Sequence, residues 1–232
     1  MAVPSVRSIE ELGAIHHVVV VVAHPDDETF CSGLICQFVE RGTVVDLLCL
    51  TRGEGGPTGP WTREELGKAR EAEMRKACEL LGIRKLVFLD HVDPVGRQDR
   101  VYAPAVSAAD LANQIRPYFQ SADFILTHGS SGEYWHPAHV LVHRAVSLAA
   151  GDCSWATFLA AREKHPIQKL VNPDDPANFI LDVSGQSSMR KAALACHESQ
   201  VPLFCRFAKG TLDDFIAKTS TEDYCVRGRE TG

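Results

Sequence analysis

The chain has 232 residues, of which 45% are hydrophobic and 23% are charged, and its formal net charge is -6. This composition is typical of a soluble globular domain, and the length is sufficient to bury a core without disulfides. The acidic balance and the lack of a long basic run argue against nucleic acid as the main partner. Every apolar run is far too short to span a bilayer, so we also expect no membrane partner.

The elements that the pattern predicts are strands and helices in alternation. Residues 1–14 are typical of a short leader or an edge element. The run at 17–23 is β-branched and apolar throughout, which predicts a strand in the middle of a parallel sheet. In chain order, the predicted elements are a strand at 17–23, a helix at 29–42, a strand at 43–51, a helix at 62–81, a strand at 85–90, a helix at 108–119, a strand at 123–129, a helix at 136–151, a strand at 178–184 and a helix at 187–200.

This alternation predicts an α/β fold, a three-layer sandwich with a mostly parallel, Rossmann-like sheet. We expect one domain over residues 1–232. Residues 199–232 are weakly patterned, and we expect a partly disordered tail there. Three further segments are predicted to be loops that set specificity: 53–61, 91–105 and 151–176.

The eight cysteines do not form a pattern typical of a disulfide framework, and no Cys-x-x-Cys pair is present. Five of them lie in apolar, regularly patterned segments: Cys31, Cys36, Cys49, Cys78 and Cys196. A free cysteine in such a segment behaves as a small buried hydrophobic residue. The first residues also lack the basic and apolar regions of a secretory signal. We therefore expect a reducing, cytoplasmic location.

Polar side chains collect where the predicted strands end. His24, Asp26, Asp27 and Glu28 directly follow the first strand. Others follow the later strands: Arg52, Glu54, Asp90, His91, His128, Glu133, Tyr134, His136 and His139. Because ligands of open α/β sheets bind beyond the carboxyl ends of the strands, we expect these residues to share one rim.

The rim residues predict a metal site. Three consecutive acids repel one another and are costly to bury without a partner, for which a cation is the simplest candidate. His136 and His139 are three residues apart at a predicted helix start, where their rings are neighbours. Two imidazoles and one carboxylate are a common catalytic zinc shell that leaves one position open for water. Since Asp26 and Asp27 are adjacent, one can bind the metal while the other takes a proton from the bound water.

Simpler interpretations exist for the same residues. The acids at 26–28 are also typical of a helix start, where the helix dipole favours negative charge. His139 alone would be an ordinary surface histidine, and His128 would be a structural residue at a strand end. The combination of the acids with His24 and the downstream histidine pair favours the metal site.

The motif "AHPDDE" after an apolar strand, with "HPxH" downstream, resembles the LmbE/PIG-L family of zinc-dependent N-acetylglucosaminyl deacetylases. The resemblance extends from about residue 18 to residue 200 and includes "TRGEGG", "FLD" and "HESQ". It implies that His24, Asp27 and His139 bind zinc, although such mixed donors also accept another divalent ion such as Fe2+. It implies that Asp26 is the general base.

The resemblance also implies roles around the metal. His136 would be the acid that protonates the leaving amine, or a cation that stabilises the transition state. Tyr134 resembles a tyrosine that helps to hold the tetrahedral oxyanion. Arg70 would contact the substrate, and Asp90 would hold sugar hydroxyls. The late "HESQ" motif, which contains His197, is interpreted as a structural hydrogen-bond network.

One position departs from the pattern of the family. The motif usually reads "HPDH", whereas this chain has Ala138 in place of the aspartate. The missing carboxylate would normally hydrogen-bond to a neighbouring imidazole, so the orientation and the pKa of His136 are affected. Asp182 or Glu198 are the acids that we consider as substitutes.

The sequence therefore predicts a hydrolase that removes the acetyl group from an N-acetylglucosamine-type sugar or conjugate, by attack of a zinc-bound water. One alternative is a zinc amidase that acts on a different N-acyl amine. Another is a catalytically silent sugar-binding module. The predicted partner is a small-molecule amino sugar, and assembly into a homo-oligomer is compatible with the sequence.

Overall fold

The architecture is built on one large sheet, in a computed structural model that describes residues 5–96 and 100–228. Its strands are β1 (Val6–Arg7), β2 (His17–Val22), β3 (Val44–Cys49), β4 (Lys85–Phe88), β5 (Phe124–Thr127), β6 (Ser154–Phe158), β9 (Phe179–Asp182) and β10 (Thr221–Arg227). The spatial order is β1-β9-β10-β6-β5-β2-β3-β4. All pairings are parallel except those of β10, which runs antiparallel to β6 and β9. A second sheet pairs β7 (Ala160–Ala161) with β8 (Asn172–Pro176).

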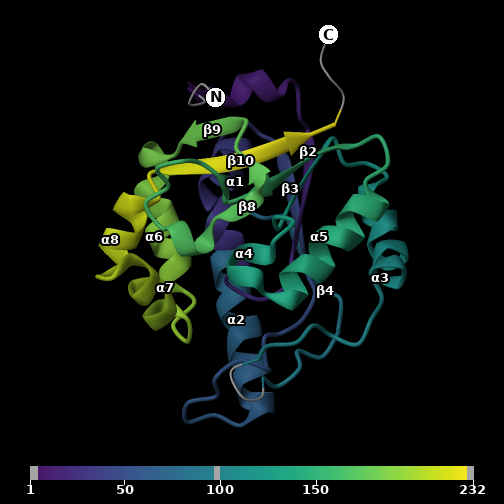
Figure 1. The fold of residues 1–232 in the computed structure, drawn as a ribbon, viewed down its shortest axis with the longest axis vertical. Coiled ribbons are helices and arrows are strands. Elements are labelled where there is room, and N and C mark those ends of the chain that lie inside the picture. Colours follow the sequence, from purple (N-terminus) through teal and green to yellow (C-terminus); the bar gives the residue numbers. More distant parts are fainter. Residues whose placement is uncertain (1–4, 97–99, 229–232) are drawn as a thin grey trace.

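Helices cover both faces of the large sheet. They are α1 (Ser32–Glu40), α2 (Arg63–Leu81), α3 (Ala108–Ile115), α4 (Gly132–Trp135), α5 (Pro137–Ala149), α6 (Ser187–Ala195), α7 (Val201–Ala208) and α8 (Leu212–Lys218). One hydrophobic core contains residues of α3 and α5, and the other contains residues of α1, α2, α6, α7 and α8. Figure 1 shows α3 and α5 to the right of strands β2 and β3, with α6 and α8 to their left. The predicted three-layer α/β sandwich is confirmed.

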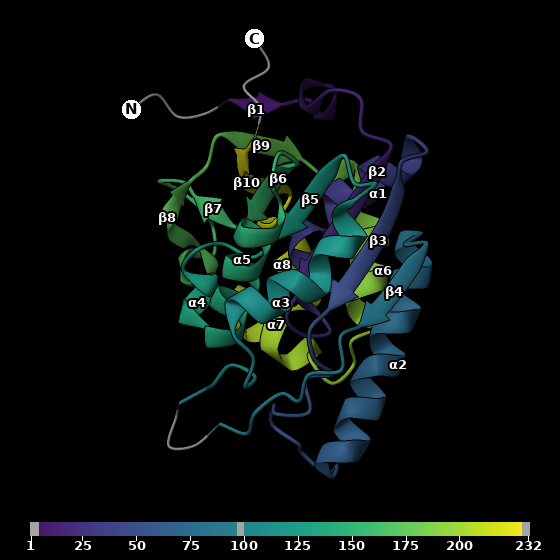
Figure 2. The ribbon, with the colours of Figure 1, turned by 90° about the vertical axis from the view of Figure 1, so that its right-hand side faces the viewer.

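Strand β2 shows why the first apolar run has no polar positions. Side chains alternate across a strand, so a strand between two helical layers is buried on both faces. Val18, Val20 and Val22 belong to one core, whereas Val19 and Val21 belong to the other. The strand lies between β3 and β5, as Figure 2 shows.

The sheet extends from β2 in two opposite directions as the chain proceeds. It first adds β3 and β4 on one side, and later β5 and β6 on the other. A topological switch point of this kind opens a crevice beyond the carboxyl ends of the strands, where ligands bind in open α/β sheets. The residues that follow β2 and β5 are therefore brought together.

Local signals in the sequence agree with several of the observed element ends. Thr62 and Glu65 form a capping box at the start of α2, whose C-cap is Gly82 with a φ of 72°. Pro137 occupies the first turn of α5, where its missing N–H costs no hydrogen bond. The helix predicted at 29–42 begins instead as a 3₁₀ helix, η2 (Asp27–Cys31), and continues as α1.

Two predictions were wrong. Residues 199–232 are not a disordered tail over the part described, since they form α7, α8 and the buried strand β10. The segment 151–176 is not only a loop, because it contains β6 and β8. Strand β10 escaped prediction because it buries acids: Glu222 accepts hydrogen bonds from the amides of Gly33 and Leu34, and Asp223 lies 2.9 Å from Arg162.

All eight cysteines lie within the described residues and are free thiols. Of the five in apolar segments, Cys31, Cys36, Cys49 and Cys78 are buried, whereas Cys196 is partly exposed. Over residues 5–96 and 100–228, no helix combines the length and the hydropathy that a transmembrane span requires.

The integration of the C-terminal strand can be tested through its aromatic residue. Tyr224 is fully buried, and its hydroxyl donates to Glu222 at 2.6 Å. We expect Tyr224→Ala to lower the free energy of unfolding by about 3–5 kcal/mol, since it opens a cavity in the core. Met189→Ala, at an exposed position of α6, is the control and should change stability by less than about 0.5 kcal/mol. Urea denaturation measures both, and equal small effects would show that β10 is not part of the core.

Candidate active site

Three predicted residues converge at the switch point. His24 Nδ1 lies 3.2 Å from His139 Nε2 and 3.4 Å from Asp27 Oδ2, and His139 Nε2 lies 3.4 Å from Asp27 Oδ1. A tetrahedral zinc ion with bonds of about 2.0–2.1 Å separates its ligand atoms by about 3.3 Å. The three side chains are buried, so their close approach is fixed by the fold. Asp27 approaches the two imidazoles through different oxygens, and each of the three separations in this metal-ligand triangle of residues is close to the spacing that a single metal ion requires.

Two neighbouring histidines enlarge the set of potential metal ligands. His136 belongs to one group of suitably spaced ligand atoms, with His24 and His139. His128 belongs to a second group, with Asp27 and His139. His139 is common to both groups, which makes its orientation decisive for the site.

Glu133 determines that orientation. Its Oε2 accepts hydrogen bonds from His139 Nδ1 at 2.8 Å and from His128 Nδ1 at 2.7 Å. The amide of Ala23 donates to His128 Nε2, so the proton of His128 is on Nδ1. Burial acts to raise the pKa of Glu133, but His128 and His139 outweigh it and lower the pKa to about 2. With Nδ1 donating to a carboxylate, His139 presents Nε2 as a free ligand atom.

The role of Glu133 was missed in the sequence, where it was only one of several rim residues. No helical spacing links it to His139, because the backbone between them is irregular. Glu133, Tyr134 and Trp135 have positive φ values of 34°, 45° and 65°. Such a conformation is costly for residues other than glycine and persists where the surroundings enforce it. Here Asn172 does so, since its Oδ1 accepts from the Glu133 amide and its Nδ2 donates to Glu133 Oε1.

The irregular segment presents Tyr134 toward the histidines. Its ring centroid lies 5.5 Å from that of His139 and 5.9 Å from that of His136. The side chain is 40% exposed, so one edge of the ring faces solvent. Tyr134 is thus beside the metal-ligand triangle, as a residue that holds the oxyanion must be.

Asp26 is held in a strained conformation next to the triangle. Its φ is 110°, and its amide donates to Glu28 Oε2 at 3.1 Å. The other oxygen of Glu28 pairs with His197 Nε2 at 2.5 Å. This contact confirms the interpretation of "HESQ" as a structural hydrogen-bond network. It also gives Glu28, which had no role in the sequence, the function of fixing the backbone of Asp26.

Arg70 contacts the same turn from helix α2. Its Nη2 donates to the carbonyl of Pro25 at 2.6 Å and lies 3.3 Å from Asp26 Oδ1, and its Nη1 donates to the carbonyl of Gly53. A Cβ at Gly53 would lie 2.3 Å from Nη1, so only glycine fits there. Burial raises the pKa of Asp26 to about 7, against the lowering effect of the Arg70 charge. The predicted contact of Arg70 with substrate stays a prediction.

Asp90 lies further out on the rim. Its side chain is exposed and accepts a hydrogen bond from Arg52 Nη1 at 2.6 Å. The predicted role in holding sugar hydroxyls stays a prediction. Asp93, three residues further on, was not singled out in the sequence. In the structure its Oδ1 lies 3.5 Å from His24 Nε2, and its Oδ2 accepts a hydrogen bond from the Gly55 amide.

His136 caps helix α5, because its Nδ1 accepts from the amide of Ala138 at 3.3 Å. Ala138 itself is fully buried in the core that contains α3 and α5. Neither acid considered as a substitute reaches this place: Asp182 accepts from the Ser184 amide, and Glu198 is exposed. Among the described residues, no carboxylate hydrogen-bonds to His136. Burial and the neighbouring His139 and His24 lower the pKa of His136 to about 2, so the ring is neutral with its proton on Nε2.

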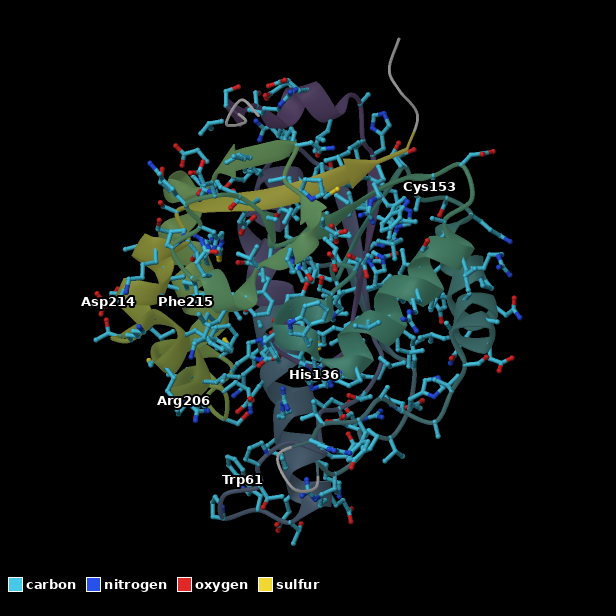
Figure 3. The ribbon with its side chains drawn as sticks, viewed as in Figure 1. Trp61, His136, Cys153, Arg206, Asp214 and Phe215 are labelled. Carbon is cyan, nitrogen blue, oxygen red and sulfur yellow. The ribbon has the colours of Figure 1, made fainter. Side chains whose placement is uncertain are left out.

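A pocket of about 420 Å³ opens beside the triangle. Its lining includes His136, Asp93, Gly55, Arg63 and Tyr102. In Figure 3, His136 lies near the middle of the molecule. A buried metal-ligand triangle, an acid beside it and an adjoining pocket define a metal-dependent hydrolase.

The comparison with known proteins identifies the family. The family model described as "PIG-L: GlcNAc-PI de-N-acetylase" matches residues 19–150, which is more than half of the chain. The chain therefore belongs to the PIG-L family, and the predicted resemblance is confirmed. The prediction of an N-deacetylase, which hydrolyses a carbon–nitrogen amide bond, is confirmed with it.

Individual relatives agree with this assignment. A probable N-acetyl-alpha-D-glucosaminyl L-malate deacetylase 2 of Bacillus anthracis is 39% identical, over 88% of this chain and 89% of the relative. A 1D-myo-inositol 2-acetamido-2-deoxy-alpha-D-glucopyranoside deacetylase of Kineococcus radiotolerans is 28% identical, over 84% and 72%. The N,N'-diacetylchitobiose deacetylase of Pyrococcus horikoshii has the same fold, with a TM-score of 0.64 and 16% identity over 94% and 86%.

The position of Glu133 leads to a test of metal affinity. In Glu133→Gln one carboxylate oxygen becomes an NH2 donor, so the side chain can no longer accept from the histidines on one side and from Gly129 and Asn172 on the other, and His139 loses its fixed orientation. We expect metal affinity to fall by about 10–100-fold, measured by competition with a chelating dye. The control is Glu198→Gln, at an exposed position after α6, which should bind metal as the wild type does. An unchanged affinity in Glu133→Gln, with the fold intact by circular dichroism, would contradict this role.

Proposed function

We propose that the protein removes the acetyl group of an N-acetylglucosamine conjugate, with a metal ion held by His24, Asp27 and His139. The observation that supports this most directly is the close approach of these three side chains: the two imidazole nitrogens are 3.2 Å apart, and each lies 3.4 Å from one of the two oxygens of Asp27. Two imidazoles and a carboxylate leave the fourth tetrahedral position for water or substrate. Zinc is the ion we propose, and Fe2+ is the alternative that the same donors accept.

A metal ion bound there supplies polarisation of the acetamide carbonyl and a water of lowered pKa. Asp26 is the general base that takes the proton from the attacking water. Its neighbours keep it in place: Glu28 binds its backbone amide, and Arg70 lies 3.3 Å from its carboxylate. Burial raises the pKa of this carboxylate, which favours its taking up a proton, whereas a bound cation would lower that pKa. The proposal has Asp26 also return this proton to the leaving amine.

His136 and Tyr134 stabilise the tetrahedral oxyanion. The cap hydrogen bond from the Ala138 amide occupies His136 Nδ1, which leaves the Nε2 proton to donate. The Tyr134 hydroxyl is the second donor, from the irregular segment on the other side of His139. The proposal assigns His136 the role of a neutral hydrogen-bond donor, in place of the acid or the cation suggested by the sequence. Ala138, where the family usually has an aspartate, offers no carboxylate to this ring, and its amide donates to Nδ1 instead.

The proposed substrate is an N-acetylglucosaminide with a small polar aglycone. The names of two relatives describe a malate and an inositol conjugate of the acetylated sugar. The pocket beside His136 would receive the sugar, with Arg70 near the acetyl group and Asp93 and Asp90 toward the hydroxyls. One domain would carry the whole activity. The free thiols of all eight cysteines support a cytoplasmic location.

Acetate release tests the proposed function. The protein loaded with zinc should release acetate from a panel of N-acetylglucosaminides, and a chelator should abolish the release until metal is restored. Asp26→Asn should bind metal as the wild type does but lose about 10²–10⁴-fold in kcat, because the general base is removed. A metal-loaded protein that releases no acetate from any sugar would favour a different N-acyl amine or a silent sugar-binding module.

The pH dependence of the reaction distinguishes between two roles for His136, a neutral hydrogen-bond donor and the general acid. The kcat/KM should rise with pH through an acid limb at or below about pH 7, since Asp26 accepts a proton only when ionised. A bound cation moves this limb to lower pH, because it favours the charged carboxylate. His136→Ala should lower kcat by about 10²–10³-fold and keep the basic limb of the wild type. Loss of the basic limb in His136→Ala would instead identify His136 as the general acid.

A further inference from the structure

The "HESQ" motif forms a turn that joins α6 to α7. The Gln200 amide closes this turn by donating to the His197 carbonyl at 2.8 Å, and we call residues 197–200 the HESQ turn. His197 is fully buried and Gln200 is buried as well, whereas Glu198 is exposed. Polar side chains are costly to bury in a connection between two helices, so their burial indicates that they bind partners inside the molecule.

His197 is connected to the proposed general base through one carboxylate. Its Nε2 pairs with Glu28 Oε1 at 2.5 Å, and the exposed fraction of both side chains is 0%. Glu28 Oε2 accepts a hydrogen bond from the Asp26 amide at 3.1 Å. Asp26 has a φ of 110°, which a residue with a side chain adopts only where its surroundings enforce it. His197 thus fixes the acceptor that holds the strained backbone of Asp26.

Ser199 binds helix α2 from the same turn. Its amide donates to Glu73 Oε1 at 2.8 Å, and its hydroxyl donates to Glu73 Oε2 at 2.7 Å. Gln200 Nε2 donates to the Ser199 hydroxyl at 3.0 Å, which leaves the hydroxyl proton for Glu73. Two hydrogen bonds to the two oxygens of one carboxylate fix its orientation as well as its position. The HESQ turn is therefore attached to α2 at a defined point.

That point lies beside the arginine that contacts Asp26. Glu73 and Arg70 are three residues apart in α2, so their side chains share one face of the helix. Arg70 Nη2 donates to the Pro25 carbonyl at 2.6 Å and lies 3.3 Å from Asp26 Oδ1. A displacement of α2 at Glu73 would move the guanidinium away from Asp26. The HESQ turn therefore fixes both supports of Asp26, its amide through Glu28 and its carboxylate through Arg70.

We propose that the HESQ turn positions the general base, and that His197 and Ser199 are positioning residues that act on Asp26. The inference rests on the proposed function, because it needs Asp26 to take the proton from the attacking water. The adjacent metal ligand is held by another contact, since Asp27 Oδ2 accepts from the His24 amide at 2.8 Å. Loss of the contacts of the HESQ turn therefore impairs proton transfer and leaves metal binding intact.

Two substitutions at His197 test the proposal. His197→Leu removes the donor to Glu28, so kcat should fall by about 10–100-fold as Asp26 loses its orientation, while KM stays within about twofold. His197→Gln places an amide N–H near the position of Nε2 and should recover kcat to within about fivefold of the wild type. Acetate release measures kcat, and competition with a chelating dye measures metal affinity. A wild-type kcat in His197→Leu would overturn the proposal, as would an about 10–100-fold loss of metal affinity, which would place the effect on the metal ligands.

Ser199→Ala tests the attachment to α2 with a milder change, because the amide bond to Glu73 is kept. We expect kcat to fall by about 3–10-fold, as for one lost hydrogen bond to a charged group, with metal affinity unchanged. The matched control is Ser188→Ala, at an exposed position of α6, which should have the kcat of the wild type. Equal kcat values in the two serine variants would overturn the role of Ser199. This comparison also decides the proposal if His197→Leu does not fold.

A double substitution distinguishes positioning of Asp26 from a general loss of structure. In Asp26→Asn the base is absent, so adding His197→Leu should lower kcat by less than about twofold further. A further loss of about 10–100-fold, equal to the loss in the wild-type background, would overturn the proposal, because His197 would then act on some group other than Asp26.

A structural measurement separates this inference from the proposed function. Crystal structures should show Asp26 with a positive φ in the wild type and with a negative φ in His197→Leu. If no sugar releases acetate but φ changes in this way, the positioning role stands and the deacetylase assignment for these sugars fails. If acetate is released and neither φ nor kcat changes in His197→Leu, the deacetylase assignment stands and the positioning role fails.

Discussion

The site depends on one carboxylate that two histidines share. Glu133 accepts from His128 and His139 with a single oxygen, and its other oxygen accepts from the Gly129 amide and from Asn172. Buried charge is tolerated only where it is paired and hydrogen-bonded, and here every contact also fixes a direction. The same contacts hold the strained backbone that presents Tyr134. The orientation of His139 and the conformation of the segment that carries Tyr134 are consequences of one buried charge.

A second set of contacts fixes the conformation of Asp26, as Glu133 fixes the orientation of His139. Glu28 binds the amide of Asp26 and is itself paired with His197, while Arg70 binds the preceding carbonyl. These partners come from η2, from the end of α6 and from α2. Residues far apart in the sequence therefore converge on two adjacent aspartates and turn them in different directions. The proposed function needs such a division, with one acid for the metal and the other for proton transfer.

The sequence was sufficient to predict the sheet around β2 and the residues that follow it, because apolar runs and the acid–histidine motif are local signals. The sequence was insufficient for segments whose buried side chains are polar or charged. Strand β10 carries Glu222 and Asp223 into the interior, so its pattern does not resemble a core strand. Glu133 was without a role because positive φ values place its side chain where no regular spacing would. Asp182 and Glu198 were wrong as partners of His136: Asp182 accepts from the Ser184 amide, Glu198 is exposed, and the Ala138 amide donates to His136 Nδ1.

The order of the strands has a consequence for how the chain folds. Strands β9 and β1 are joined to the rest of the large sheet only through β10, which comes after them in the chain. Until β10 inserts, the sheet consists of two separate pieces, and both β6 and β9 expose an unpaired edge. Open edges of this kind pair with other chains, and contacts between distant segments form slowly. The last strand of the sheet thus closes the fold, and conditions that delay its insertion favour aggregation over recovery of the native state.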